Sequence, residues 1–522
     1  MKSRAESARE QAARFLEQAA QFHLGDLPTE GRHPLTCDLA GLACNDLPQA
    51  LRVLKQIDCA AIERVLGSSQ RVDELSARMR DCIAGGRRVF FYGCGATGRL
   101  SLSLEYLWRF VQRGSAKSEA VRGFMSGGDL ALVHSIENFE DHPEFGARQL
   151  REIGFAPDDL LVCCTEGGET PSVIGACEAA AAVAREKPWF LYCNPDDVLR
   201  AHVERSRRVL EDARIEKLNL HVGPMSLSGS TRLQASTALM LGAGAALLRD
   251  SPGEFPEVDL AAFLEFLRGL DTGFLVPFVE AESALYLRGE YVLYETNHYG
   301  ITILTDTTER APTFSLPGFE NNQDPERRPS ASFLCLPEAE NAASAWRQIL
   351  LREPITLEWK EMAGVAGKKR LMGFDFSRNA RAQREALLDG KRQHVFRIER
   401  EGDALVMRLG EHEARVDVSP LHPLCEHVLL KLLLNAHSTL LMGRVGRYES
   451  NLMTWVRPSN KKLIDRAIRY IAFLLARSGI DAFSYEDIAY ECFARMQDLQ
   501  PDESIVMKTV FALRARAAGK HP

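Results

Sequence analysis

Residues 88–99 read Arg-Val-Phe-Phe-Tyr-Gly-Cys-Gly-Ala-Thr-Gly-Arg, so an apolar run leads directly into a turn that is rich in glycine. The spacing of the apolar residues after the turn predicts an amphipathic helix. A buried strand that enters a helix in this way brings free backbone N–H groups together, and such groups bind anions. We therefore predict a site for a phosphorylated ligand, with the hydroxyl of Thr97 as an added donor. The predicted loop residues are Gly93, Gly95, Thr97, Gly98 and Arg99.

Two other interpretations of this turn remain open at the level of the sequence. A dinucleotide site also needs an acidic residue at the end of the next strand, about 20 residues further on. The stretch Arg-Gly-Phe-Met-Ser-Gly-Gly-Asp at 122–129 is a poor match to that pattern. A tight packing turn without any ligand would also require glycine. A phosphate site is the interpretation that we favour.

Two further segments of the same half have a similar form. The apolar run 158–166 ends at Gly-Gly-Glu-Thr-Pro-Ser, and residues 223–232 are a cluster of glycine and hydroxyl residues before an expected helix. Hydroxyl residues at a helix start are commonly N-caps, so one such segment alone would indicate only structure. Three of them favour a shared site, because parallel sheets bind ligands at the carboxyl ends of their strands. The candidate ligand-binding residues are Gly168, Glu169, Thr170, Ser228, Ser230 and Thr231.

Composition and charge restrict the kinds of protein that this sequence can encode. The chain has 522 residues, of which 45% are hydrophobic, and a formal net charge of −7. It has no basic tract for nucleic acid, no apolar run as long as a membrane helix and no apolar signal segment at its N-terminus. The 12 cysteines form no Cys-x-x-Cys pair. We therefore expect reduced thiols in a cytoplasmic protein, with neither a metal nor a cofactor.

The order of the expected elements divides the chain into five parts. Short apolar runs alternate with helical patterns in two long segments, and this alternation is typical of doubly wound parallel sheets. Residues 385–416 are expected to be strands, which either complete the second sheet or form a β excursion. The expected parts are a helical layer against the first sheet at 1–84, the first α/β domain at 85–250, a helical linker at 251–285, the second α/β domain at 286–450 and a helical cap at 451–522.

These motifs together resemble the sugar-isomerase (SIS) domain. The resemblance is carried by residues 93–100, by 127–141 with its Gly-Gly-Asp and three later acidic residues, by Gly-Ser-Thr-Arg at 229–232, and by 451–463. Within the superfamily the chain is similar to the branch that contains N-acetylmuramic acid 6-phosphate etherase and the animal glucokinase regulatory protein. The resemblance implies an α/β fold with two SIS domains in one chain, as a pseudo-dimer. The second domain is degenerate, because its glycine loop has become Asn-His-Tyr-Gly at 297–300.

The resemblance also implies roles for particular residues. In the etherases a glutamate removes the proton next to a carbonyl group, and an acid assists the departure of the lactyl ether. Glu137 matches one glutamate of the family, and Glu140 follows one helical turn later as a ligand-binding residue. The other family glutamate is matched by Glu309, in the second half. Lys462 matches a lysine that reaches the sugar-phosphate pocket of the regulatory proteins, whereas Glu169 stands where the family has arginine.

Three functions of different class are consistent with these residues. The first is a regulator that resembles glucokinase regulatory protein, senses a phosphorylated hexose or amino sugar and has a sugar kinase as its partner. The alternative is a lyase that cleaves the lactyl ether of N-acetylmuramic acid 6-phosphate, with Glu137 and Glu309 as catalytic residues. The third is an isomerase of another phosphosugar. A pair of carboxylates that face one pocket would separate the lyase from the regulator.

Overall fold

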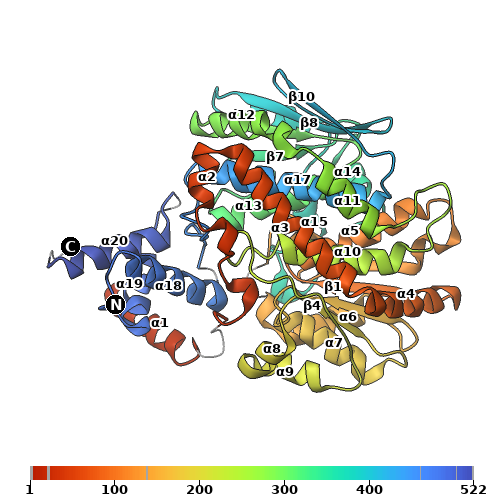
Figure 1. Ribbon diagram of the computed structural model, residues 1–522, viewed down its shortest axis with the longest axis horizontal. Coiled ribbons are helices and arrows are strands. Elements are labelled where there is room, and N and C mark those ends of the chain that lie inside the picture. Colours follow the sequence, from red (N-terminus) through yellow and green to blue (C-terminus); the bar gives the residue numbers. More distant parts are fainter. Residues whose placement is uncertain (1–3, 20–23, 137–138, 459, 501, 520–522) are drawn as a thin grey trace.

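The structure is a computed structural model that describes residues 4–19, 24–136, 139–458, 460–500 and 502–519. It is an α/β protein with two five-stranded sheets, one from each half of the chain, and helices cover both sheets (Figure 1). No helix within these ranges is long and apolar enough to cross a membrane.

The first sheet has the strand order β2-β1-β3-β4-β5, and all of its neighbouring strands are parallel. β1 and β3 are buried along their whole length, which explains why their sequences are continuous apolar runs. The chain order reverses at β1, between β2 and β3, and ligands of such sheets bind at this point. The strands are β1 (Val89–Gly93), β2 (Val121–Met125), β3 (Leu160–Cys164), β4 (Trp189–Tyr192) and β5 (Glu216–Asn219).

Helices pack on both faces of this sheet. Phe90 and Tyr92 point into the smaller core on one face, while Val89 and Phe91 point into the larger core on the other. α6 (Pro143–Glu152), α7 (Pro171–Val183) and α9 (Glu204–Glu211) cover the smaller core, with α8 (Asp196–His202) beside α9. α5 (Ala96–Val111) and α10 (Gln234–Leu248) pack together over the larger core.

The second sheet has the order β10-β9-β8-β6-β7 and is mixed rather than parallel throughout. β6 pairs in parallel with β7 and β8, but β8, β9 and β10 form an antiparallel meander. Gly402 and Gly410 have φ of 61° and 60°, and two-residue hairpins require such values. The strands expected at 385–416 therefore complete the second sheet. The five strands are β6 (Tyr291–Glu295), β7 (Ser332–Cys335), β8 (Gln393–Glu401), β9 (Ala404–Leu409) and β10 (His412–Asp417).

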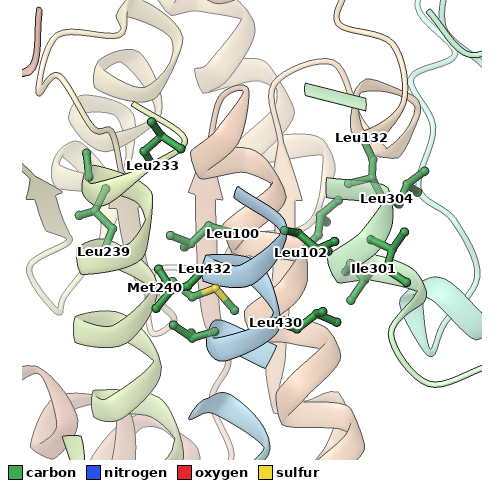
Figure 2. Packing of buried hydrophobic residues seen from close by; sticks show 14 of the residues in the cluster. Leu100, Leu102, Leu132, Leu233, Leu239, Met240, Ile301, Leu304, Leu430 and Leu432 are labelled. Carbon is green, nitrogen blue, oxygen red and sulfur yellow. The ribbon is translucent and has the colours of Figure 1, made fainter. Parts of the chain in front are cut away.

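The helices between the two sheets form a continuous core. Figure 2 shows Leu100 of α5, Met240 of α10, Leu432 of α17 and Leu304 of α13 in this core. Because both halves contribute to it, they share one hydrophobic interior. The helices of the second half and of the linker are α11 (Leu260–Gly269), α12 (Val276–Leu287), α13 (Gly300–Phe314), α14 (Ala342–Leu350), α15 (Lys368–Met372), α16 (Ala380–Glu385) and α17 (Pro423–Arg444).

The two ends of the chain meet outside the sheets (Figure 1). α3 (Leu47–Gly67) and α4 (Ser69–Ala84) pack on α10, and α2 (Leu39–Asn45) packs on α17. α1 (Arg4–Leu16) instead packs on the C-terminal helices, where the rings of Phe15 and Phe493 lie 5.7 Å apart. The helical cap therefore includes the first helix as well as the last three, which are α18 (Lys461–Ala476), α19 (Tyr485–Met496) and α20 (Ile505–Ala517).

Candidate functional site

The glycine turn after β1 is held in shape by contacts within the loop. A Cβ on Gly93 would lie 2.4 Å from the backbone of Thr97, and one on Gly98 would lie 2.5 Å from the side chain of Met125. Gly95 has a φ of 56°, which favours glycine. The Thr97 hydroxyl donates to the carbonyl oxygen of Cys94 (2.9 Å) and accepts from its N–H (3.1 Å). The hydroxyl that we expected to serve a phosphate thus also closes the turn.

A pocket of about 150 Å³ opens beside this turn. Its lining combines the first half of the chain with Pro312 of α13 in the second half and with Asn460 at the start of α18. Segments more than 300 residues apart in the sequence therefore meet at one cavity. The polar lining residues are Cys94, Ser126, Ser135, Glu140 and Asn460.

Glu140 is one of the two expected acidic residues near this pocket. Its Oε1 accepts a hydrogen bond of 2.7 Å from the amide of Asn460, and its Oε2 lies 3.6 Å from the sulfur of Cys94. Burial raises the pKa of Glu140, and the charges of Glu169 and Asp141 add to the increase. Glu137, which we expected to be catalytic, lies outside the described residues.

The second loop brings Glu169 into contact with the C-terminal helices. Lys462 of α18 pairs with its Oε1 at 2.9 Å, and Arg205 of α9 pairs with its Oε2 at 2.6 Å. Burial alone would raise the pKa of Glu169, but these two cations lower it to about 2. Glu169 is therefore ionised and holds the lysine that was expected to reach the site. Gly168 precedes it with a φ of 74°, and the Thr170 hydroxyl lies 3.0 Å from that of Thr165.

The third loop contains hydroxyls that the fold uses and a buried hydroxyl, that of Ser230, that it does not. Ser228 donates to the carbonyl of Glu30 (2.8 Å), so the fold already occupies the hydroxyl that we expected to bind a ligand. Ser230 is 4% exposed, and its hydroxyl has no hydrogen-bond partner among the described residues. Thr231 contributes its carbonyl to the start of α10, through the N–H of Ser236. Ser230 is thus the residue of this loop that retains a free donor.

Glu309 reaches the first half of the chain from α13. Its Oε1 lies 2.5 Å from the guanidinium of Arg99, which is buried in α5 directly after the glycine turn. Glu309 also lines a small cavity of about 30 Å³ together with Ala96 and Ser236. Pro312, on the next turn of the same helix, lines the larger pocket. Both cavities therefore border the start of α5, and α13 contributes to both.

Glu166 is a candidate that the sequence analysis did not select. It follows β3, is 8% exposed and accepts a hydrogen bond of 2.8 Å from the Ser236 hydroxyl. Burial raises its pKa to about 7, which is suitable for a group that exchanges a proton near neutral pH. The sequence did contain a sign of this residue, because a carboxylate that follows a fully apolar strand is unusual and could have been noted as a candidate. Among the described residues no cluster of three or more His, Cys, Asp or Glu could hold a metal ion.

Comparison with known proteins agrees with this architecture. The model of the glucokinase regulatory protein N-terminal SIS domain matches residues 69–181. N-acetylmuramic acid 6-phosphate etherase from Brucella anthropi is 33% identical over 234 residues, which are 43% of this chain and 68% of the relative. The etherase from Mesorhizobium japonicum is 32% identical over 228 residues, which are again 43% of this chain and 68% of the relative.

Among solved structures, tagatose-6-phosphate ketose/aldose isomerase from Escherichia coli aligns with a TM-score of 0.40 and 9% identity, over 77% of this chain and 93% of that one. The family model covers residues 69–181, which contain the glycine turn and the loop after β3. The chain therefore belongs to the SIS-domain family of the N-acetylmuramic acid 6-phosphate etherases and the glucokinase regulatory protein.

Proposed function

We propose that this chain binds a phosphorylated hexose or amino sugar at the pocket beside the glycine turn and acts on it as a carbon–oxygen lyase of the etherase type. The observation that carries the proposal is the composition of the pocket. The glycine turn of the first half, α13 of the second half and the start of α18 all line it. Relatives that match over 68% of their length are named etherases, which supports the chemistry.

Phosphate binding would use the positive end of α5 and groups that the fold leaves available. The first turn of α5 presents backbone N–H groups, and the free hydroxyl of Ser230 adds a donor. Lys462 would exchange part of its contact with Glu169 for the phosphate, since Arg205 still pairs with that carboxylate. Lysine suits this role because its ammonium group is a point charge on a flexible stem.

The elimination itself would use two carboxylates. One removes the proton from the carbon next to the carbonyl group of the opened sugar, the electron pair forms the double bond, and the C–O bond of the ether breaks. The other gives its proton to the departing oxygen. We assign these roles jointly to Glu309 and Glu137, as the resemblance implies. Glu309 supports the assignment because it crosses from the second half to the start of α5.

A second candidate function is a sensor of a hexose phosphate that regulates a partner such as a sugar kinase. It is favoured by the ion pair between Glu169 and Lys462, which links the loop after β3 to the helical cap. A phosphate that displaced this contact would change how α18 is held. The 12 free cysteines support our further proposal that the protein works in a reducing cytoplasm.

The test is a thermal-shift screen followed by product analysis. The ligands are fructose 6-phosphate, fructose 1-phosphate, glucosamine 6-phosphate and N-acetylmuramic acid 6-phosphate, with inorganic phosphate as the control. A ligand at about 100 times its Kd should add roughly 2.7 kcal/mol to the free energy of unfolding. Release of lactate from an ether substrate would support the lyase, whereas binding without turnover would favour the sensor. No shift with any of the four sugars would contradict both.

A further inference from the structure

A segment of the second half crosses to the first half beside the candidate pocket. It runs from Arg352 to Trp359, between α14 and α15, and we call it the strap. The N–H of Asp129 donates to the carbonyl of Ile355 (2.9 Å), and the N–H of Ile355 donates to the carboxylate of Asp129 (2.6 Å). Arg352 forms an ion pair with the same carboxylate. The strap is therefore fixed to the segment that follows β2.

The last residue of the strap, Trp359, belongs to a buried aromatic cluster. Its ring centre lies 5.6 Å from that of Phe139, and the two rings are tilted by only 21°. Phe145 packs against both, with its ring centre 5.1 Å from Phe139 and 5.6 Å from Trp359. The guanidinium of Arg148 lies over the indole at 3.9 Å, and the indole N–H donates to Glu152. These contacts hold the indole on several sides.

Phe139 connects this cluster to the pocket. Its side chain lines the pocket, and so does that of the next residue, Glu140, which contacts Cys94 and Asn460. Both residues belong to a single 3₁₀ turn, Phe139–Asp141. The hydrogen bonds of such a turn have poor geometry, so the turn depends on packing to fix its position. The packing partner of Phe139 therefore also determines where the carboxyl group of Glu140 lies.

We propose that Trp359 is a positioning residue of the candidate site, which holds Phe139 and, through it, Glu140 in place for a phosphosugar. This inference rests on the proposed function, because it presupposes that a phosphosugar binds in this pocket. It also gives the second half a role at the site, although that half has lost its own glycine turn. Its α13 contributes Pro312 to the lining of the pocket, and its strap supports the wall that Phe139 forms.

The first measurement is calorimetric titration with N-acetylmuramic acid 6-phosphate and with fructose 6-phosphate. Trp359→Ala removes the ring on which Phe139 packs, so we expect affinity to fall about tenfold or more, as small displacements of site residues do. Trp359→Phe keeps an aromatic face and should bind within about threefold of the unmodified protein. Trp359→Leu keeps an apolar side chain without that face, and it serves as the test if the alanine variant does not fold.

Trp189→Ala is the matched control. Trp189 is also buried and also lies beneath an arginine, with the guanidinium of Arg71 at 4.7 Å. It begins β4, at the amino ends of the parallel strands, whereas the glycine turn follows the carboxyl end of β1. We expect this variant to lose stability and to keep its affinity within about twofold, because the two sites are distant and independent.

The second measurement needs no ligand. Hydrogen exchange reports how firmly a local segment is held, so we expect the amides of residues 139–145 to exchange faster in Trp359→Ala than in the unmodified protein. Trp359→Phe and Trp189→Ala should leave this exchange unchanged.

The two measurements separate this inference from the proposed function. Unchanged affinity in Trp359→Ala and Trp359→Leu, or unchanged exchange at 139–145, would overturn the role of Trp359 and leave the proposed function in place. An equal loss of affinity in Trp359→Ala and Trp189→Ala would also overturn it, because binding would then follow stability alone. If neither sugar binds the folded, unmodified protein, the proposed function fails and this inference fails with it.

Discussion

The buried carboxyl group of Glu166 lowers the free energy of unfolding when it is ionised, so this loss of stability depends on pH. Its pKa is about 7 in the folded state against 4.5 for an ordinary glutamate, so the folded state holds the proton more tightly than the unfolded state. The penalty is therefore absent below about pH 4.5 and grows as the pH rises through 7. We expect Glu166→Gln to raise the free energy of unfolding by roughly 2 kcal/mol at pH 8 and to change it little at pH 4.5. Urea denaturation at the two pH values measures this difference, and an equal effect at both would contradict it.

Thr97 has a role within the fold that the sequence did not reveal. Its hydroxyl makes two hydrogen bonds to the backbone of Cys94. We expect Thr97→Val to cost about 1–2 kcal/mol of stability without any ligand, because the N–H and the carbonyl of Cys94 both lose a partner. Thermal denaturation measures that loss, and titration with a sugar phosphate then shows whether affinity falls as well. An unchanged melting temperature would mean that the turn does not depend on this hydroxyl.

Among the secondary-structure elements, the crossing of α6 and α7 depends on two glycines. A Cβ on Gly175 would lie 2.1 Å from the carbonyl oxygen of Pro143, and one on Gly146 would lie 1.9 Å from that of Ser172. Gly175→Ala should therefore destabilise the protein by about 1–3 kcal/mol, because the helices must separate. Gly67→Ala at the end of α3 is the control, since a Cβ there meets no atom within 4 Å. Chemical denaturation of the two variants gives the comparison, and equal stabilities would contradict the close approach.

The sequence predicts local elements better than it predicts contacts between them. The glycine turn, the apolar strands on either side of it and the helices that follow were all expected from spacing and turn residues. Strands were expected at 385–416 as well, but the antiparallel pairing of β9 and β10 was not, because short apolar runs do not show the direction in which strands pair. The contact of α1 with α19 was also missed, since two amphipathic helices at opposite ends of a chain give no sign of each other.

The site could be predicted only where its residues form local motifs. Gly95 and Glu140 both line the larger pocket, and Lys462 pairs with Glu169 of the loop after β3. Glu166 was not selected because what distinguishes it is a carboxyl group whose pKa is raised by burial, and burial depends on the fold of the whole domain. The partner of Ser228, the carbonyl of Glu30, lies far away in the sequence, whereas Thr97 bonds to the backbone of Cys94 in its own turn.

At the scale of the whole molecule, buried ion pairs join the two halves. Arg352, which follows α14, lies 2.5 Å from Asp129 and 2.9 Å from Glu105, both in the first half. Arg352→Ala should destabilise the protein by about 3–5 kcal/mol, because it leaves buried carboxylates without this partner. Arg347→Ala is the control, since its pair with Glu353 is exposed and should contribute little. Guanidinium denaturation compares the two variants, and a similar small effect would show that the halves do not rely on this contact.

The central claim is that one sugar-phosphate site is built from the first half and the C-terminal helices together. The most direct test is the Kd of a bound sugar phosphate, measured by calorimetry for the unmodified protein, Lys462→Ala and Lys461→Ala. Lys462 lies at Glu169 beside the loops of the first half, whereas Lys461 points to Gln18 of the N-terminal segment. We predict that Lys462→Ala weakens binding about tenfold or more and that Lys461→Ala leaves it unchanged. Unchanged binding by both variants would confine the site to the first half and contradict the claim.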